Sequence, residues 1–164
     1  MEPPGTPNLI KSKKTSTQKN IENSHPINHG VKIELENGIT AKYVNAVHSS
    51  TLPDGSPGGN PGGFIIESKH GNFYYAGDTA LHMDMQLIGQ YHSIDFALLP
   101  IGDNFTMGYE DAAIAAEMVK TKNVIGLHYD TFGFIEIDHA KAKDAFKKKN
   151  VTLLLPEIGE EINL

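Results

Sequence analysis

Residues 94–128 read IDFALLPIGDNFTMGYEDAAIAAEMVKTKNVIGLH and predict a strand, a helix and a second strand. The apolar run 94–99 is typical of a buried strand, and a second short run, 124–127, ends at His128. Residues 109–120 between them have small apolar side chains at helical spacing, namely Ala112, Ala115, Ala116 and Val119. This β-α-β pattern predicts a parallel sheet with its helix packed on one face.

The residues on either side continue the alternation of helices and strands. A short helix is predicted over 83–91, and Asp138 is placed to cap a second helix over 139–149. An apolar run at 151–155 predicts the last strong strand, and residues 158–164 predict a weak edge strand.

Two hairpins precede these elements. Apolar and polar residues alternate over 31–35 and 39–43 on either side of Asn37-Gly38, which is a strong hairpin signal. Residues 64–67 and 73–76 predict a second pair of strands. Hairpins followed by β-α-β-α-β predict a layered α/β domain.

Length and composition limit the possible classes of protein. The 164 residues correspond to one domain at ~150 residues per domain. Cysteine is absent, which excludes disulfide scaffolds and zinc-thiolate sites. All 14 basic residues are Lys and the net charge is −6, so nucleic acid is an unexpected partner. Without a long apolar run or a signal peptide, we expect a cytoplasmic protein with no membrane partner.

The N-terminal segment differs from the rest in composition. Residues 11–20 read KSKKTSTQKN and contain no apolar side chain, so they have nothing to bury against a core. We therefore expect residues 1–23 to be a disordered polar tail and residues 24–164 to form the domain.

Three polar residues follow predicted strands directly or closely: His48, Asp78 and His128. Side chains just beyond strand ends converge at one edge of a layered α/β sheet. Two imidazoles and a carboxylate are a suitable ligand set for zinc, iron or manganese. The alternative is that each residue has a structural role, since a single His or a Gly-Asp turn is common outside functional sites.

Several motifs together resemble the metallo-β-lactamase fold superfamily, in particular its family of uncharacterised bacterial metal-dependent hydrolases. They are VHSS at 47–50, NPGGF at 60–64, YAGDT at 75–79, LLPIGDNFTMG at 98–108 and HYDTF at 128–132. The resemblance runs from about Ser24 to Leu164. It implies the C-terminal half of an αββα sandwich, with a two-metal site at one end of the sheets.

The resemblance also implies roles for individual residues. His48 would bind the first metal, His128 the second, and Asp78 would bridge both and act in catalysis. Loop residues beside this site, Asn104, Thr106 and Thr131, would bind substrate. The cofactor would be a divalent metal. Zinc is the first candidate, and manganese and iron are the alternatives. A metal-bound hydroxide would then hydrolyse a small-molecule ester, lactone, amide or phosphoester.

One departure from the family pattern leaves two hypotheses open. The superfamily's main metal motif, H-x-H-x-D-H, has no counterpart here, because the sequence contains no H-x-H. The chain is therefore expected to be either part of an active hydrolase or a catalytically incompetent, truncated remnant or partner module. Half a sandwich would also expose an apolar sheet face, so a homo-oligomer is a further expectation.

The remaining His residues are expected to have smaller roles. We expect His70 and His92 at the surface and His139 at the start of a helix, and we consider His82 a candidate for the rim of the site.

Overall fold

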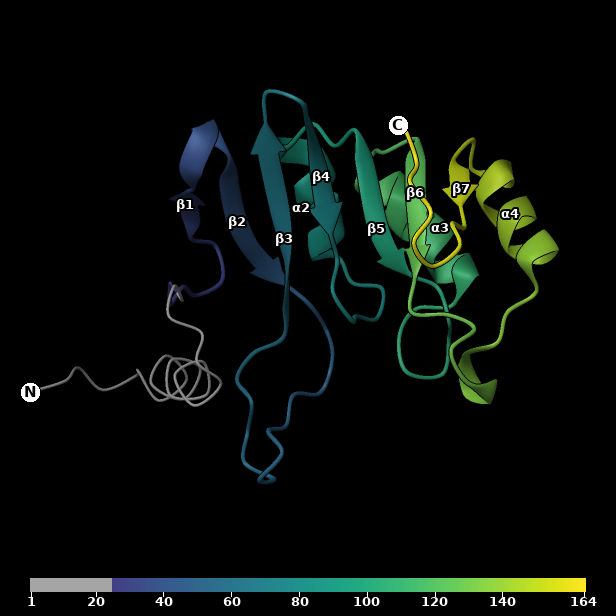
Figure 1. Ribbon diagram of the computed structural model, residues 1–164, viewed down its shortest axis with the longest axis horizontal. Coiled ribbons are helices and arrows are strands. Elements are labelled where there is room, and N and C mark those ends of the chain that lie inside the picture. Colours follow the sequence, from purple (N-terminus) through teal and green to yellow (C-terminus); the bar gives the residue numbers. More distant parts are fainter. Residues whose placement is uncertain (1–24) are drawn as a thin grey trace, which may run out of the picture.

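A single mixed sheet of seven strands organises the protein (Figure 1). The computed structural model describes residues 25–164, so the predicted tail at 1–23 lies outside the described residues. Neighbouring strands in the sheet follow chain order from first to last. The strands are β1 (Lys32–Glu34), β2 (Thr40–Asn45), β3 (Gly62–Ser68), β4 (Gly71–Tyr75), β5 (Phe96–Pro100), β6 (Asn123–Leu127) and β7 (Thr152–Leu154).

Three helices connect the later strands. They are α2 (Asp84–Tyr91), α3 (Tyr109–Met118) and α4 (His139–Lys148), and two short 3-10 turns are η1 (Glu36–Gly38) and η2 (Gly133–Ile135). The Asp138 carboxylate accepts hydrogen bonds from the N–H groups of Ala140 and Lys141, which confirms the predicted cap of α4. Figure 1 shows α2 and α3 behind the sheet, and α4 packs against α3 and β7.

The sheet changes from antiparallel to parallel at β4. Strands β1 to β4 pair antiparallel, and β4 to β7 pair parallel. The first hairpin forms as predicted, because Asn37 and Gly38 take the positive φ angles, 61° and 72°, that its tight turn requires. As a result the C-terminal ends of β2, β4, β5 and β6 all lie at the same edge of the sheet.

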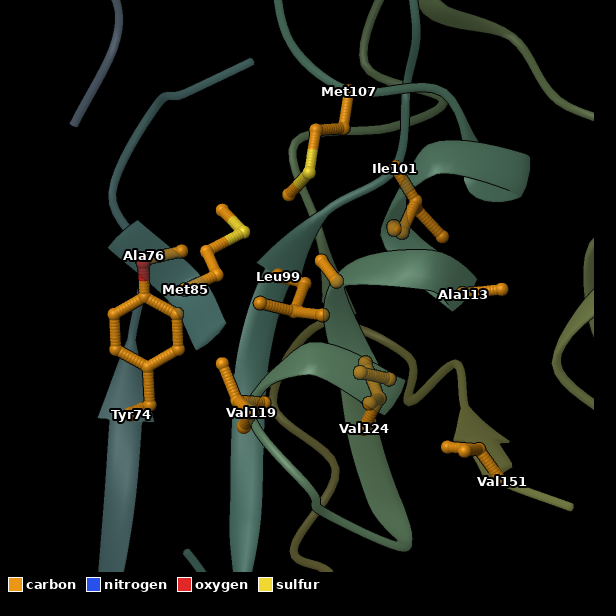
Figure 2. Close-up of a cluster of buried hydrophobic side chains, with 14 of the residues drawn as sticks. Tyr74, Ala76, Met85, Leu99, Ile101, Met107, Ala113, Val119, Val124 and Val151 are labelled. Atoms are coloured by element: carbon orange, nitrogen blue, oxygen red, sulfur yellow. The ribbon is translucent and has the colours of Figure 1, made fainter. Parts of the chain in front are cut away.

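The core lies between the sheet and the helices (Figure 2). Tyr74, Ala97 and Val124 are paired side by side across three strands, and all three are fully buried on the helix side. The small side chains predicted for α3 are also buried, which lets that helix approach the sheet closely.

Among residues 25–164 no helix packs on the opposite face of the sheet, and Figure 1 shows only the C-terminal segment passing in front of β6 there. Because side chains alternate along a strand, the neighbours of the buried residues point to this face. Phe73 and Phe96 stack on each other there with ring centroids 5.1 Å apart, and Tyr43 lies 5.1 Å from Phe64. None of these four aromatic side chains is fully buried.

One predicted strand is wrong. Residues 158–164 form no strand, and the Ile158 side chain is fully exposed. The chain turns at Gly159, whose φ is +87°, and the Glu160 carboxylate accepts a hydrogen bond from the Glu157 N–H. A local turn with acidic side chains replaces edge pairing, because no apolar alternation favours the strand.

Candidate metal centre

Asp78 and His128 face each other beyond the ends of β4 and β6. The Asp78 Oδ2 and His128 Nε2 atoms are 4.0 Å apart, too far for a direct hydrogen bond. The His128 Nδ1 atom is buried and has no hydrogen-bond partner in the described part of the chain. Two close polar groups that make no hydrogen bond to each other are a suitable arrangement for a pair of metal ligands.

His128 is held in an unusual backbone conformation. Its φ is +56°, and its carbonyl oxygen packs against the α-carbon of Gly102 in the loop after β5. A Cβ atom added at Gly102 would lie 2.1 Å from that oxygen. The backbone of the β5 loop therefore fixes the position of the residue that carries the imidazole.

His48 and Asp78 line a common shallow cavity of about 310 Å³. The His48 Nδ1 atom is 2.8 Å from the carbonyl oxygen of Ser49, so this nitrogen is the protonated donor. In a ring that carries a single proton, the Nε2 atom is then the one with a free lone pair and can bind a metal ion.

A buried threonine ties the loops of this edge together. The Thr79 Oγ1 atom accepts a hydrogen bond from the Val47 N–H and donates one to the Ala80 carbonyl. The Thr79 carbonyl accepts a hydrogen bond from the Met107 N–H. The sequence offers the Thr79 hydroxyl as a possible hydrogen-bonding group beside Asp78, but only the structure shows which loops it joins.

The structure thus places Asp78 close to His128, and places His48 and Asp78 around one cavity. Within residues 25–164, no three His, Cys, Asp or Glu side chains come close enough together to hold one metal ion. The joint assignment of His48, Asp78 and His128 to a metal site stays a prediction. Their donor types suit a divalent ion, and neither the Asp78 carboxylate nor His48 Nε2 has a hydrogen-bond partner among the described side chains.

The predicted substrate-binding residues lie in two loops near this edge. Asn104 and Thr131 are exposed, and Thr106 is half-buried. Two half-exposed rings accompany them, Phe105 and Phe132, with centroids 6.0 Å apart. The substrate-binding roles stay predictions.

The other His residues have varied surroundings. His70 is exposed, as expected. The expectation of a surface position for His92 is wrong, since the end of α2 lies against β2 and β3 and leaves its side chain only 12% exposed. Both ring nitrogens of His82 are buried, and neither has a hydrogen-bond partner within residues 25–164. Burial lowers the pKa of His82, and nearby Asp84 only partly opposes this effect.

A second His–Asp contact supports the loop that follows His128. The His139 Nε2 atom lies 2.5 Å from Asp130 Oδ2, and Asp130 Oδ1 accepts a hydrogen bond from the Ile137 N–H. Partial burial raises the pKa of Asp130, but these hydrogen bonds outweigh it and hold the pKa below its usual value. The sequence placed His139 correctly at a helix start and did not indicate this pairing.

The mixed sheet, its helical layer and the polar residues at the strand ends define an α/β domain of the metallo-β-lactamase type. Residues 3–129 match the family described as the beta-lactamase superfamily domain, and the chain belongs to this family. Structural neighbours share this fold, which confirms the fold class expected from the sequence motifs.

Individual relatives carry names that refer to metal-dependent hydrolysis. A "UPF0173 metal-dependent hydrolase" of Christiangramia forsetii is 57% identical over 140 residues, which cover 85% of this chain and 62% of the relative. A protein of the same name from Flavobacterium johnsoniae is 53% identical over 142 residues, covering 87% of this chain and 63% of the relative.

A solved structure gives the same result in three dimensions. Igni18, described as a novel metallo hydrolase from Ignicoccus hospitalis, superposes with a TM-score of 0.80 at 31% identity. The superposition covers 93% of this chain and 65% of that protein. The chain therefore spans somewhat less than two thirds of the length of these relatives. None of the helices in residues 25–164 is long and apolar enough to cross a membrane.

Proposed function

We propose that this chain supplies part of the active site of a metal-dependent hydrolase. The observation that carries the proposal is the 4.0 Å approach of Asp78 to His128, beside the cavity that Asp78 shares with His48. The names of the relatives point to the same reaction class. The substrate would be a small-molecule ester, lactone, amide or phosphoester.

His48, Asp78 and His128 would hold the divalent ion, with zinc as the first candidate. A bound divalent ion would supply Lewis-acid polarisation and lower the pKa of water. The hydrogen bond from His48 Nδ1 to the Ser49 carbonyl fixes the orientation of the ring and leaves Nε2 available to the ion. The Thr79 hydrogen bonds hold the loops that carry His48 and Asp78 at a fixed separation.

The surrounding loops would bind the substrate. Asn104 and Thr131 offer exposed hydrogen-bonding groups, and Phe105 and Phe132 offer apolar surface beside them. The net charge of −6 and the absence of Arg disfavour a polyanionic substrate such as RNA.

A second candidate function is that of a partner module without activity of its own. The uncovered face of the sheet favours it, because stacked aromatic pairs such as Phe73–Phe96 remain partly exposed there. Apolar surface of this kind is typical of an interface. The occupant would be a polypeptide that resembles the 38% of the Christiangramia forsetii relative left unmatched by this chain.

One experiment separates the two candidates. The 164-residue chain is assayed with a model lactone, p-nitrophenyl acetate and bis-p-nitrophenyl phosphate, in excess zinc or manganese, with and without the unmatched segment of the relative. We expect little turnover by the chain alone, and oligomers or poor solubility on size-exclusion chromatography. Addition of the segment should restore turnover that a chelator abolishes.

Each possible result of this experiment bears on a different expectation. Robust chelator-sensitive turnover by the chain alone would exclude the partner-module candidate. Binding of the segment with no turnover under any condition would favour the partner module and contradict the hydrolase. A sharp monomer peak with cooperative melting would show that the uncovered face needs no partner.

A further inference from the structure

A groove between α2 and β2 has a volume of about 420 Å³. This volume falls within the range of small-molecule sites. The groove lies on the helix side of the sheet and runs along α2, whose eight residues span about 12 Å. No role in the proposed hydrolase reaction depends on it.

The walls of the groove are mostly apolar. Val44 and Ile65 from the sheet and Ile88 from α2 line its floor. Leu87 and Tyr91, one helical turn apart, line its outer wall and are 53% and 72% exposed. An apolar ligand lying along α2 would cover side chains that are otherwise in contact with water.

One end of the groove carries a chain of polar contacts. The Lys42 ammonium is 3.4 Å from His92 Nε2, and His92 Nδ1 is 3.0 Å from the Glu67 carboxylate. A carboxylate only accepts hydrogen bonds and an ammonium only donates them. Lys42 can therefore donate to His92 Nε2 only from a ring whose single proton is on Nδ1, toward Glu67.

The charges at this end do not cancel. Glu67 is already paired with Lys32 and accepts a further hydrogen bond from Thr40. The hydrogen bond from Lys32, followed by that from His92, lowers the pKa of Glu67 to about 2. Glu67 is thus paired with one ammonium group, that of Lys32, and Lys42 has no acidic partner in the described part of the chain.

The opposite end of the groove is acidic. Asp84 lies at the start of α2, and its Oδ2 atom accepts a hydrogen bond from the Asn45 side chain. A second carboxylate placed here would be repelled. The groove therefore suits one negative charge at the Lys42 end and an uncharged, apolar remainder.

We propose that the groove between α2 and β2 is a binding site for a small monocarboxylate with an apolar body, whose carboxylate pairs with Lys42. The apolar body lies along Leu87 and Tyr91 and ends short of Asp84. The site is independent of the proposed metal centre, so either can fail without the other.

The test titrates the ¹⁵N-labelled 164-residue chain with 4-phenylbutyrate and follows its amide signals by NMR. We expect saturable shifts confined to α2 and β2. The neutral 4-phenylbutyramide should bind about tenfold or more weakly, since a charge-assisted hydrogen bond is lost. This comparison needs no variant, so it does not depend on any substitution folding correctly.

Variants locate the charge. Lys42→Met should weaken binding of the acid to the level of the amide, and Lys42→Arg should retain it. Lys69→Met, at an exposed position in the β3–β4 turn, is the matched control and should bind like the unchanged protein. Equal binding of acid and amide, unaltered binding by Lys42→Met, or no saturable shift at millimolar probe would overturn the proposal. So would a dimer that occupies the groove and is dissociated by Tyr91→Ala.

Discussion

Replacement of Gly102 by alanine tests whether the β5 loop positions His128. The new Cβ atom would lie 2.1 Å from the His128 carbonyl oxygen and 3.0 Å from Cβ of Ile135. Contacts under 3.0 Å force a movement, so the two backbones must separate by about 0.9 Å. Both atoms of the closest contact are in or next to the backbone, and no flexible side chain can move aside.

Two opposing effects set the magnitude. Gly→Ala reduces the entropy of the unfolded chain, which stabilises a protein by about 0.4–1 kcal/mol where the backbone allows it. Overpacking a buried site costs about 1–3 kcal/mol. Because Gly102 is buried and its closest neighbour is a carbonyl, we expect a net loss of about 1–2 kcal/mol in the free energy of unfolding.

The effect should also reach the metal centre. A shift of the His128 backbone changes the position of its imidazole relative to Asp78, so zinc affinity should fall about tenfold or more. Urea unfolding measures the first effect and a calorimetric zinc titration the second. Gly133→Ala is the control, because its Cβ would meet nothing within 4 Å. If Gly102→Ala matched this control in both assays, the β5 loop would not position His128.

Two further perturbations test other parts of the site. Asp78→Asn should reduce metal content more than His48→Ala or His128→Ala, because the Asp78 carboxylate would serve two ions. Wild-type metal content in all three variants would show that the site assignment is wrong. Acidification below the ordinary His pKa of about 6.5 should destabilise the fold through His82, because its lowered pKa means that the unfolded chain takes up more protons in this range. His82→Phe should flatten this part of the curve of unfolding free energy against pH, and an unchanged slope would contradict the role assigned to burial.

Local pattern was enough to predict the elements of the sheet. Alternation around Asn37-Gly38 predicted the first hairpin, and helical spacing of small residues predicted the buried face of α3. Both signals depend on neighbours within a few positions, where backbone geometry alone sets which side chains share a face. The predicted strand at 158–164 failed because it had no such alternation, and a local turn was available instead.

The candidate site, too, is predicted in part by the sequence and decided in part by long-range contacts. Placement of His48, Asp78 and His128 beyond strand ends follows from chain order, because strands β2, β4 and β6 share a direction. The separation of the side chains at that edge does not follow from chain order. Thr79 and Gly102 decide how the loops lie, through contacts with residues 26 to 32 positions away.

The sequence by itself determined the order of strands and helices, the buried faces and the family to which the chain belongs. Only the tertiary structure decided that the ring nitrogens of His82 are buried and that the His92 side chain is just 12% exposed. It also decided that Lys42 meets His92 across 50 positions and that a groove opens beside α2. The physical reason is the distance along the chain over which each kind of interaction acts. Periodicity and turn chemistry act between close neighbours, whereas burial and charge pairing depend on which distant residues the completed sheet brings into contact.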